Sequence, residues 1–158
     1  MKPATAELLQ SLDEAEWFAH VGEEADIPRL AQVSSWDEAI ESCTAGGWDD
    51  LRLQARNFLS VQISGASRER WRAWPAIQEE IHARVWDMIQ RKAADVRVPE
   101  SKRDAFYGSI TWDLHLAAME VEHADIVEPG LASLLAEVYR LGHFPCGDEE
   151  GTGRLVVY

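Results

Sequence analysis

Two Glu-x-x-His strings in the sequence have the spacing with which helical bundles bind iron. They are Glu79 with His82 and Glu120 with His123. A carboxylate and an imidazole three residues apart on a helix can reach one metal ion. A helix turns by about 300° over three residues, however, and Glu120 and His123 then lie on different sides of the helix expected here. We therefore expect solvated carboxylates and partly buried histidines, with no metal and no cofactor.

His143 and Cys146 form an H-x-x-C string that could bind zinc or pair a general base with a nucleophile. A structural zinc needs four ligands, and the other histidines and cysteines are scattered singly along the chain. The favoured interpretation is that Cys146 packs as a small apolar residue while His143 bonds a helix end. A metal or nucleophile site built on His143, Cys146 and His123 is the alternative.

Other catalytic patterns are missing from the sequence. It contains no G-x-S-x-G, no phosphate-binding P-loop, no G-x-G-x-x-G and no H-E-x-x-H. The sequence therefore predicts a protein that is not an enzyme.

The charge of the chain is strongly negative. Its formal net charge is −13, from 15 basic and 28 acidic residues. A field of this sign repels nucleic acid and anionic lipid and attracts cationic partners. We expect a basic protein partner, with no nucleic acid and no membrane.

Acidic residues are concentrated in the last third of the chain. Residues 105–158 hold nine acids against two arginines. Such a cluster is typical of a surface that steers a basic partner. The predicted partner-binding residues are Asp148, Glu149, Glu150, Glu120, Glu122 and Asp125.

The hydrophobic periodicity predicts an all-α fold, a single domain over 1–158 with about six helices. The expected helices are about 4–20, 35–46, 48–65, 67–95, one from near 101 to past 120, and 129–141. Ser35 with Glu38 and Ser101 with Asp104 have capping-box spacing, and Ser67 could cap the fourth helix. Pro75 should kink that helix or restart it.

The fifth expected helix carries two apolar stripes on nearly opposite sides. One contains Phe106, Ile110 and Leu114, and the other contains Trp112, Leu116, Met119 and His123. A helix that is apolar on two sides is buried on both, so we place it at the centre of the bundle.

The segment 142–158 departs from the helical pattern. Gly142 can end a helix, three further glycines permit tight reversals, and the residues Arg-Leu-Val-Val-Tyr favour a strand. Because an isolated hairpin is only marginally stable, we expect this tail to be a short loop or β-hairpin flap docked on the bundle.

The sequence shows neither a signal peptide nor an apolar run of about 18 residues. Its two cysteines, Cys43 and Cys146, have no disulfide-framework spacing. A cytoplasmic location is expected.

The carboxyl-terminal third resembles a group of small bacterial cytoplasmic proteins. The shared pattern is a Trp-Asp helix (Trp112, Asp113), an M-E-x-E-x-x-D stretch, a helix with Tyr139, the element G-x-F-P-C-G and a closing strand. The resemblance implies no catalytic residues. Asp148 stands where the pattern often has an aromatic residue, so a surface contact shared at that point is not implied.

Small acidic helical proteins also include bacterial toxin-immunity proteins, a similarity of class only. The combined expectation is a non-enzymatic interaction module, an immunity-type inhibitor of a basic toxin or nuclease domain. A homo-oligomer is a further possibility, because some of the seven tryptophans could lie at an interface.

Overall fold

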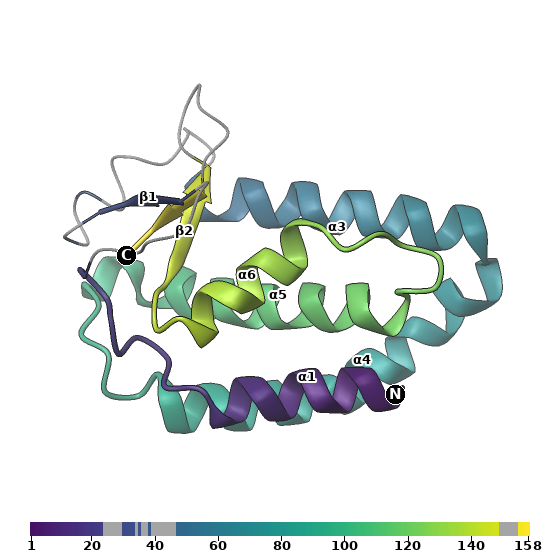
Figure 1. Ribbon diagram of the computed structural model, residues 1–158, viewed down its shortest axis with the longest axis horizontal. Coiled ribbons are helices and arrows are strands. Elements are labelled where there is room, and N and C mark those ends of the chain that lie inside the picture. The colour runs from purple at the N-terminus through teal and green to yellow at the C-terminus, as the bar shows by residue number, and fades with distance from the viewer. Residues whose placement is uncertain (24–29, 34, 36–37, 39–46, 149–154) are drawn as a thin grey trace.

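The computed structural model describes residues 1–158 except 24–29, 34, 36–37, 39–46 and 149–154. The described residues form five α-helices, one 3₁₀ turn and three short strands (Figure 1). The helices are α1 (Pro3–Glu14), α3 (Gly47–Ala66), α4 (Arg68–Lys92), α5 (Arg103–Glu122) and α6 (Leu131–Arg140); the 3₁₀ turn η1 is Glu100–Lys102. The strands are β1 (Leu30–Gln32), β2 (Pro145–Asp148) and β3 (Leu155–Val157). The mostly helical fold predicted from the sequence is confirmed.

The described helices number five where the sequence predicted six. The helix expected over 35–46 lies almost wholly outside the described residues, although the backbone N–H of Glu38 does donate to Ser35 Oγ at 3.2 Å. Ser67 caps α4 as expected, by accepting from the N–H of Arg70. The expected Ser101 cap is wrong, because α5 begins after Lys102 without a side-chain cap. The restart at Pro75 is also wrong, since α4 continues through it.

The first helix ends earlier than its apolar pattern suggested. Ala15 after α1 has an extended backbone, with φ −70° and ψ 149°. The indole N–H of Trp17 then donates to the carbonyl of Leu12 at 2.8 Å, which satisfies one of the free carbonyls at the helix end. Trp17 and Phe18 are buried in the core even though they lie outside the helix. Their apolar side chains explain why the helix was predicted to continue.

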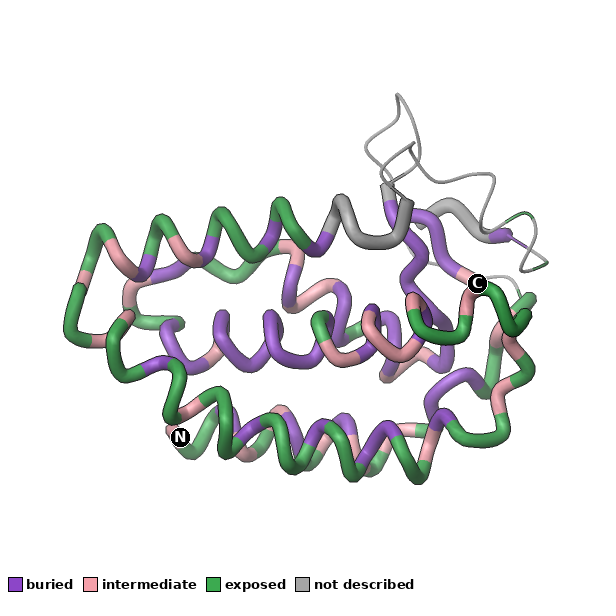
Figure 2. The backbone as a smooth tube through the Cα atoms, turned by 180° about the vertical axis from the view of Figure 1, so that it is seen from behind, coloured by how far each residue is buried: buried purple, intermediate pink, exposed green. Residues whose placement is uncertain are grey.

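Helix α5 runs through the middle of the molecule, as predicted. It contacts α1, α3, α4 and α6, and most of its residues are buried (Figure 2). The buried apolar residues lie all around it, and include Phe106, Ile110, Leu114, Leu116, Ala117, Ala118 and Met119. Among the described residues, no helix is both long and apolar enough to cross a membrane.

The three strands form one small sheet at one end of the helices (Figure 1). Strand β3 lies in the middle, antiparallel to β2 and parallel to β1, with Leu155 opposite Leu30. Leu155 and Val157 pack on Leu135 and Val138 of α6. The predicted carboxyl-terminal hairpin is therefore present and docked, and β1 adds a third strand that the sequence analysis did not predict.

Gly142 fixes the approach of the tail to the bundle. It ends α6 with φ +79°, and its carbonyl accepts from the N–H of His20 at 2.8 Å. A Cβ at this position would lie 2.7 Å from His20 Cδ2. Glycine is therefore required here both by backbone conformation and by space.

Candidate functional site

Two acids expected in a partner-binding surface are buried. Glu122 accepts from Thr5 Oγ1 at 2.6 Å and from the backbone N–H of Lys2 at 2.8 Å, which attaches α1 to the end of α5. Glu120 accepts a hydrogen bond from the hydroxyl of Ser133 on α6. Both carboxylates are nearly inaccessible to solvent. In this structure they connect helices and are not available to a partner, which corrects the expectation from the sequence.

Asp125 is exposed, but its charge is compensated within the protein. It lies 2.8 Å from Lys2 Nζ and 2.5 Å from Arg70 Nη1. The hydrogen bonds from Lys2 and then Arg70 hold the pKa of Asp125 well below its ordinary value. Asp125 therefore adds little negative field for a distant partner.

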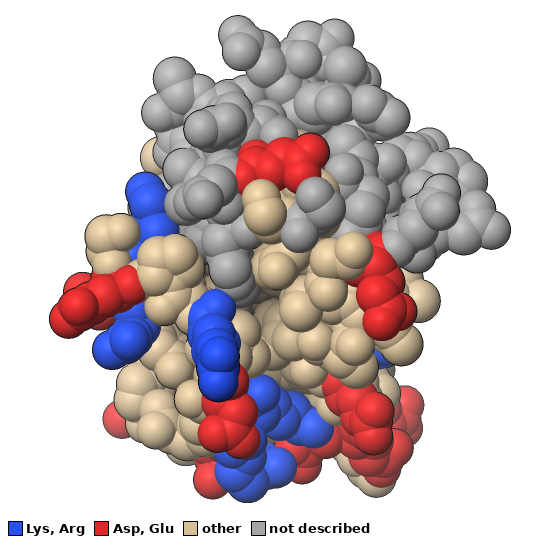
Figure 3. Space-filling model, turned by 90° about the vertical axis from the view of Figure 1, so that its left-hand side faces the viewer, with Lys and Arg blue, Asp and Glu red and all other residues tan. Residues whose placement is uncertain are grey.

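Of the acidic run of the tail, the structure describes only Asp148, which lies in the sheet. Asp148 is the last residue of β2, and its backbone is opposite Leu155. Glu149 and Glu150 fall outside the described residues. Figure 3 faces this end of the molecule and shows acidic and basic side chains interspersed over its described surface.

The H-x-x-C pair is buried in the tail. Cys146 is fully buried, and its thiol lies 3.6 Å from the carbonyl oxygen of Phe144. His143 is also buried, and its Nδ1 has no hydrogen-bond partner among the described residues. Burial lowers the pKa of His143, the nearby His20 lowers it further, and Glu23 opposes the shift. Within the described part of the chain, no three His, Cys, Asp or Glu side chains are grouped to hold a metal.

His123, the third residue of that alternative site, has a structural environment of its own. Its Nδ1 donates to the carbonyl of Met119 at 2.9 Å, one turn earlier on α5. Its ring packs edge-on against Trp74 of α4, with 5.6 Å between ring centroids. His123 thus packs between α4 and α5, whereas the ring that approaches His143 belongs to His20.

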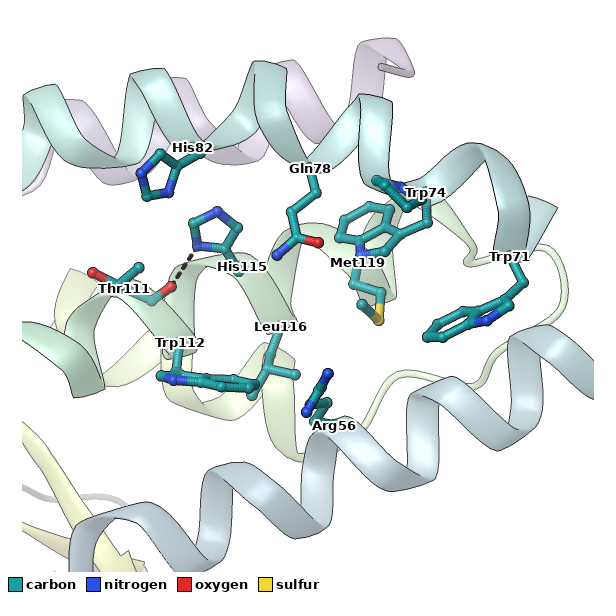
Figure 4. Close-up of a pocket in the computed structure, with 11 residues that line it drawn as sticks. Arg56, Trp71, Trp74, Gln78, His82, Thr111, Trp112, His115, Leu116 and Met119 are labelled. Atoms are coloured by element: carbon teal, nitrogen blue, oxygen red, sulfur yellow. Dashed lines mark hydrogen bonds between the residues drawn. The ribbon is translucent and has the colours of Figure 1, made fainter.

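The described residues line a pocket between α3, α4 and α5 that sequence reasoning missed (Figure 4). Its volume is about 550 Å³. The lining residues are Arg56 from α3, Trp71, Trp74, Pro75, Gln78 and His82 from α4, and Thr111, Trp112, His115, Leu116 and Met119 from α5. Buried side chains form its floor, and exposed ones form its rim.

His115 is the buried polar group of the pocket. Its Nδ1 lies 2.6 Å from the carbonyl oxygen of Thr111, which can only accept, so Nδ1 carries the hydrogen. Burial lowers the pKa of His115, the nearby His82 lowers it further, and the Thr111 hydrogen bond opposes the shift. The ring is therefore neutral at pH 7 and its Nε2 is an acceptor. That atom is buried without a partner among the described residues.

Arg56 forms the opposite side of the pocket. Its guanidinium lies over the ring of Trp112, 5.2 Å from the centroid. Among the described residues no carboxylate pairs with it. The rings of His82 and His115 lie 5.4 Å apart on the α4 side of the same space (Figure 4).

The sequence did contain the signal for this pocket. Trp112, Leu116 and Met119 were correctly predicted to form a second apolar stripe on the central helix. The same spacing is found in an apolar stripe that packs against a neighbouring helix and in one that lines an open pocket, so the spacing alone does not distinguish them.

Comparison of the chain with protein-family models, with curated proteins and with solved structures found no match.

Proposed function

We propose that this protein is a non-enzymatic interaction module, an inhibitor of the immunity type that binds a basic toxin or nuclease domain. The observation that carries the proposal is the net charge of −13, with a sequence pI of about 4.7. Charge of this size accelerates encounter with a basic partner and disfavours acidic ones.

The sheet end is the proposed docking surface. The stretch 23–50, which contains β1 and the start of α3, holds eight acids and one arginine. The stretch 148–150, which follows β2, holds three acids in succession. Strand β1, within the first stretch, and Asp148, at the start of the second, belong to the same sheet. Asp148, Glu149 and Glu150 therefore remain the residues to test, whereas Glu120 and Glu122 do not.

The experiment first identifies the partner and then measures its rate of association. Tagged protein is used to capture proteins from a lysate of the source cell at low and high salt. A basic protein retained mainly at low salt is purified and mixed with the wild type in stopped flow. The triple variant Asp148→Asn, Glu149→Gln and Glu150→Gln should associate roughly threefold to tenfold more slowly and with a weaker salt dependence.

The matched control changes the same amount of charge elsewhere. Glu7, Glu79 and Glu128 are exposed acids on α1, on α4 and before α6. Their triple replacement by glutamine should leave the association rate within about a factor of two of the wild type. Equal slowing by the two triple variants would contradict the sheet-end surface, and a captured partner without excess positive charge would contradict the proposed function.

A further inference from the structure

We propose that the pocket between α3, α4 and α5 binds a small planar aromatic carboxylate that also carries an N–H or O–H donor. This site is separate from the sheet-end surface, and the proposal does not depend on the identity of a protein partner.

The size and walls of the pocket suit a flat apolar molecule. Its volume of about 550 Å³ is within the range of small-molecule sites, roughly 300 to 1,000 Å³. Trp71, Trp74 and Trp112 contribute aromatic surface from two helices, while Leu116 and Met119 contribute aliphatic and thioether surface. Aromatic side chains offer a planar ligand stacking and edge contacts at little conformational cost.

The charge of the lining selects an anion. Arg56 is the cationic residue of the pocket, and none of its lining residues is acidic. The guanidinium is positioned against Trp112, and no carboxylate among the described residues competes for its donors. A guanidinium binds a carboxylate through two parallel hydrogen bonds. A carboxylate on the ligand therefore completes an interaction that the described structure leaves open.

A second polar requirement comes from His115. Its Nδ1 is committed to Thr111, so its buried Nε2 can only accept when the ring is neutral. An unmade hydrogen bond at a buried acceptor is costly, and a ligand donor removes that cost. In Figure 4 the ring extends from α5 toward α4, where His82 and Gln78 flank the same space. The ligand thus needs a donor as well as a carboxylate.

The probes are three indoles that differ by one group each, together with benzoate and naphthalene-2-carboxylate. Indole-3-carboxylate has both the carboxylate and a ring N–H. Indole-3-carboxamide lacks the charge, and 1-methylindole-3-carboxylate lacks the donor. Binding to the full chain is measured by calorimetry and by saturation-transfer NMR, and the protein amides that shift locate the site.

Indole-3-carboxylate should bind at least tenfold more tightly than its amide, because the amide cannot form a charged hydrogen-bond pair with Arg56. The 1-methyl derivative should bind roughly tenfold more weakly than the parent acid, because it cannot donate to His115.

Substitutions in the protein test whether Arg56 causes the preference for the carboxylate and His115 the preference for the ring N–H. Arg56→Gln should abolish the preference for the acid over the amide, and His115→Phe should abolish the penalty for the methyl group. Arg84→Gln, on the exposed surface of α4 outside this pocket, is the matched control and should change neither preference. Gln78→Trp adds bulk at the exposed rim and should weaken all the acids without disturbing the core.

The combined result decides the proposal. Tighter binding of the acid, lost in Arg56→Gln and kept in Arg84→Gln, would support it. If none of the aromatic carboxylates bound at about 1 mM, or if acid and amide bound equally, the proposal would be wrong. Neither result depends on folding of a core variant, because Arg56, Gln78 and Arg84 are all exposed.

Discussion

Arg52 of α3 and Asp113 of α5 form an ion pair inside the protein, with 2.7 Å between Nη2 and Oδ2 and exposed fractions of 1% and 0%. The hydroxyl of Tyr139 on α6 donates to the same carboxylate oxygen at 2.7 Å. The guanidinium also donates to the carbonyls of Pro145 and Cys146, at 2.7 and 3.2 Å. One buried network therefore joins α3, α5 and α6 to strand β2.

Removing one partner of this ion pair should strongly destabilise the protein. Asp113→Leu leaves the Arg52 guanidinium buried without its counter-charge, and Arg52→Met does the reverse. Each change should lower the free energy of unfolding by about 3 to 5 kcal/mol, measured by urea denaturation. The double variant should lose clearly less free energy of unfolding than the sum of the two single losses, because no uncompensated charge remains buried. Strict additivity would contradict direct coupling of the two charges.

Gly142→Ala should destabilise the junction between α6 and the tail. Alanine is strained at φ +79°, and its Cβ would clash with the His20 ring at 2.7 Å. We expect a loss of roughly 1 to 3 kcal/mol in the free energy of unfolding. Gly108→Ala within α5 is the control, since its Cβ meets nothing within 4 Å and helix propensity should add about 0.5 to 1 kcal/mol. The free energy of unfolding should therefore fall in Gly142→Ala and rise in Gly108→Ala.

Acid should destabilise the fold through two buried histidines, His115 and His143. The pKa of His115 is lowered in the folded protein, so the unfolded chain takes up this proton first, near pH 6.5. Stability is then lost as the pH falls from about 6.5 toward the folded pKa, and it is fully present above that range. His115→Phe should reduce the slope of unfolding free energy against pH in this window. His143→Phe should reduce it too, because the pKa of His143 is also lowered. An unchanged slope in both variants would contradict their burial as neutral rings.

Cys146 should be unreactive in the native protein. Its thiol is fully buried, whereas a catalytic thiol must be reached by its substrate. In a Cys43→Ser background, iodoacetamide should label Cys146 only at the rate at which the protein opens, and labelling should rise steeply with urea. Labelling is measured by mass spectrometry. Rapid labelling of the native protein would contradict this prediction and favour the alternative in which His143 and Cys146 form a nucleophile site.

Helical periodicity predicted the larger part of the fold. The two stripes of α5 required contacts on both sides, and the structure places that helix against four others. Periodicity could not show which polar residues of α5 are buried. Asp113, Glu120 and Glu122 are charged in the sequence, and only residues distant along the chain, such as Arg52, Ser133 and Thr5, satisfy them inside.

The three-stranded sheet and the pocket could not be predicted from local sequence patterns, for a related reason. Strand β1 has only three residues and pairs with β3, which lies far away in sequence. The pocket depends on the distances at which α3, α4 and α5 pack. Both features arise from non-local packing, which one sequence does not encode as a periodicity.

The central position of β3 has a consequence for biosynthesis. Strands β1 and β2 are each paired with β3, and β3 is the last of the three to leave the ribosome. Until residues 155–157 emerge, β1 has no strand to pair with, whereas the helices between the strands can already form and pack together. Completion of the sheet is thus a late event that joins two distant stretches of chain, and a long-range closure of this kind is slow relative to helix formation. We expect the nascent chain to pass through a helical intermediate that lacks the β1–β3 pairing.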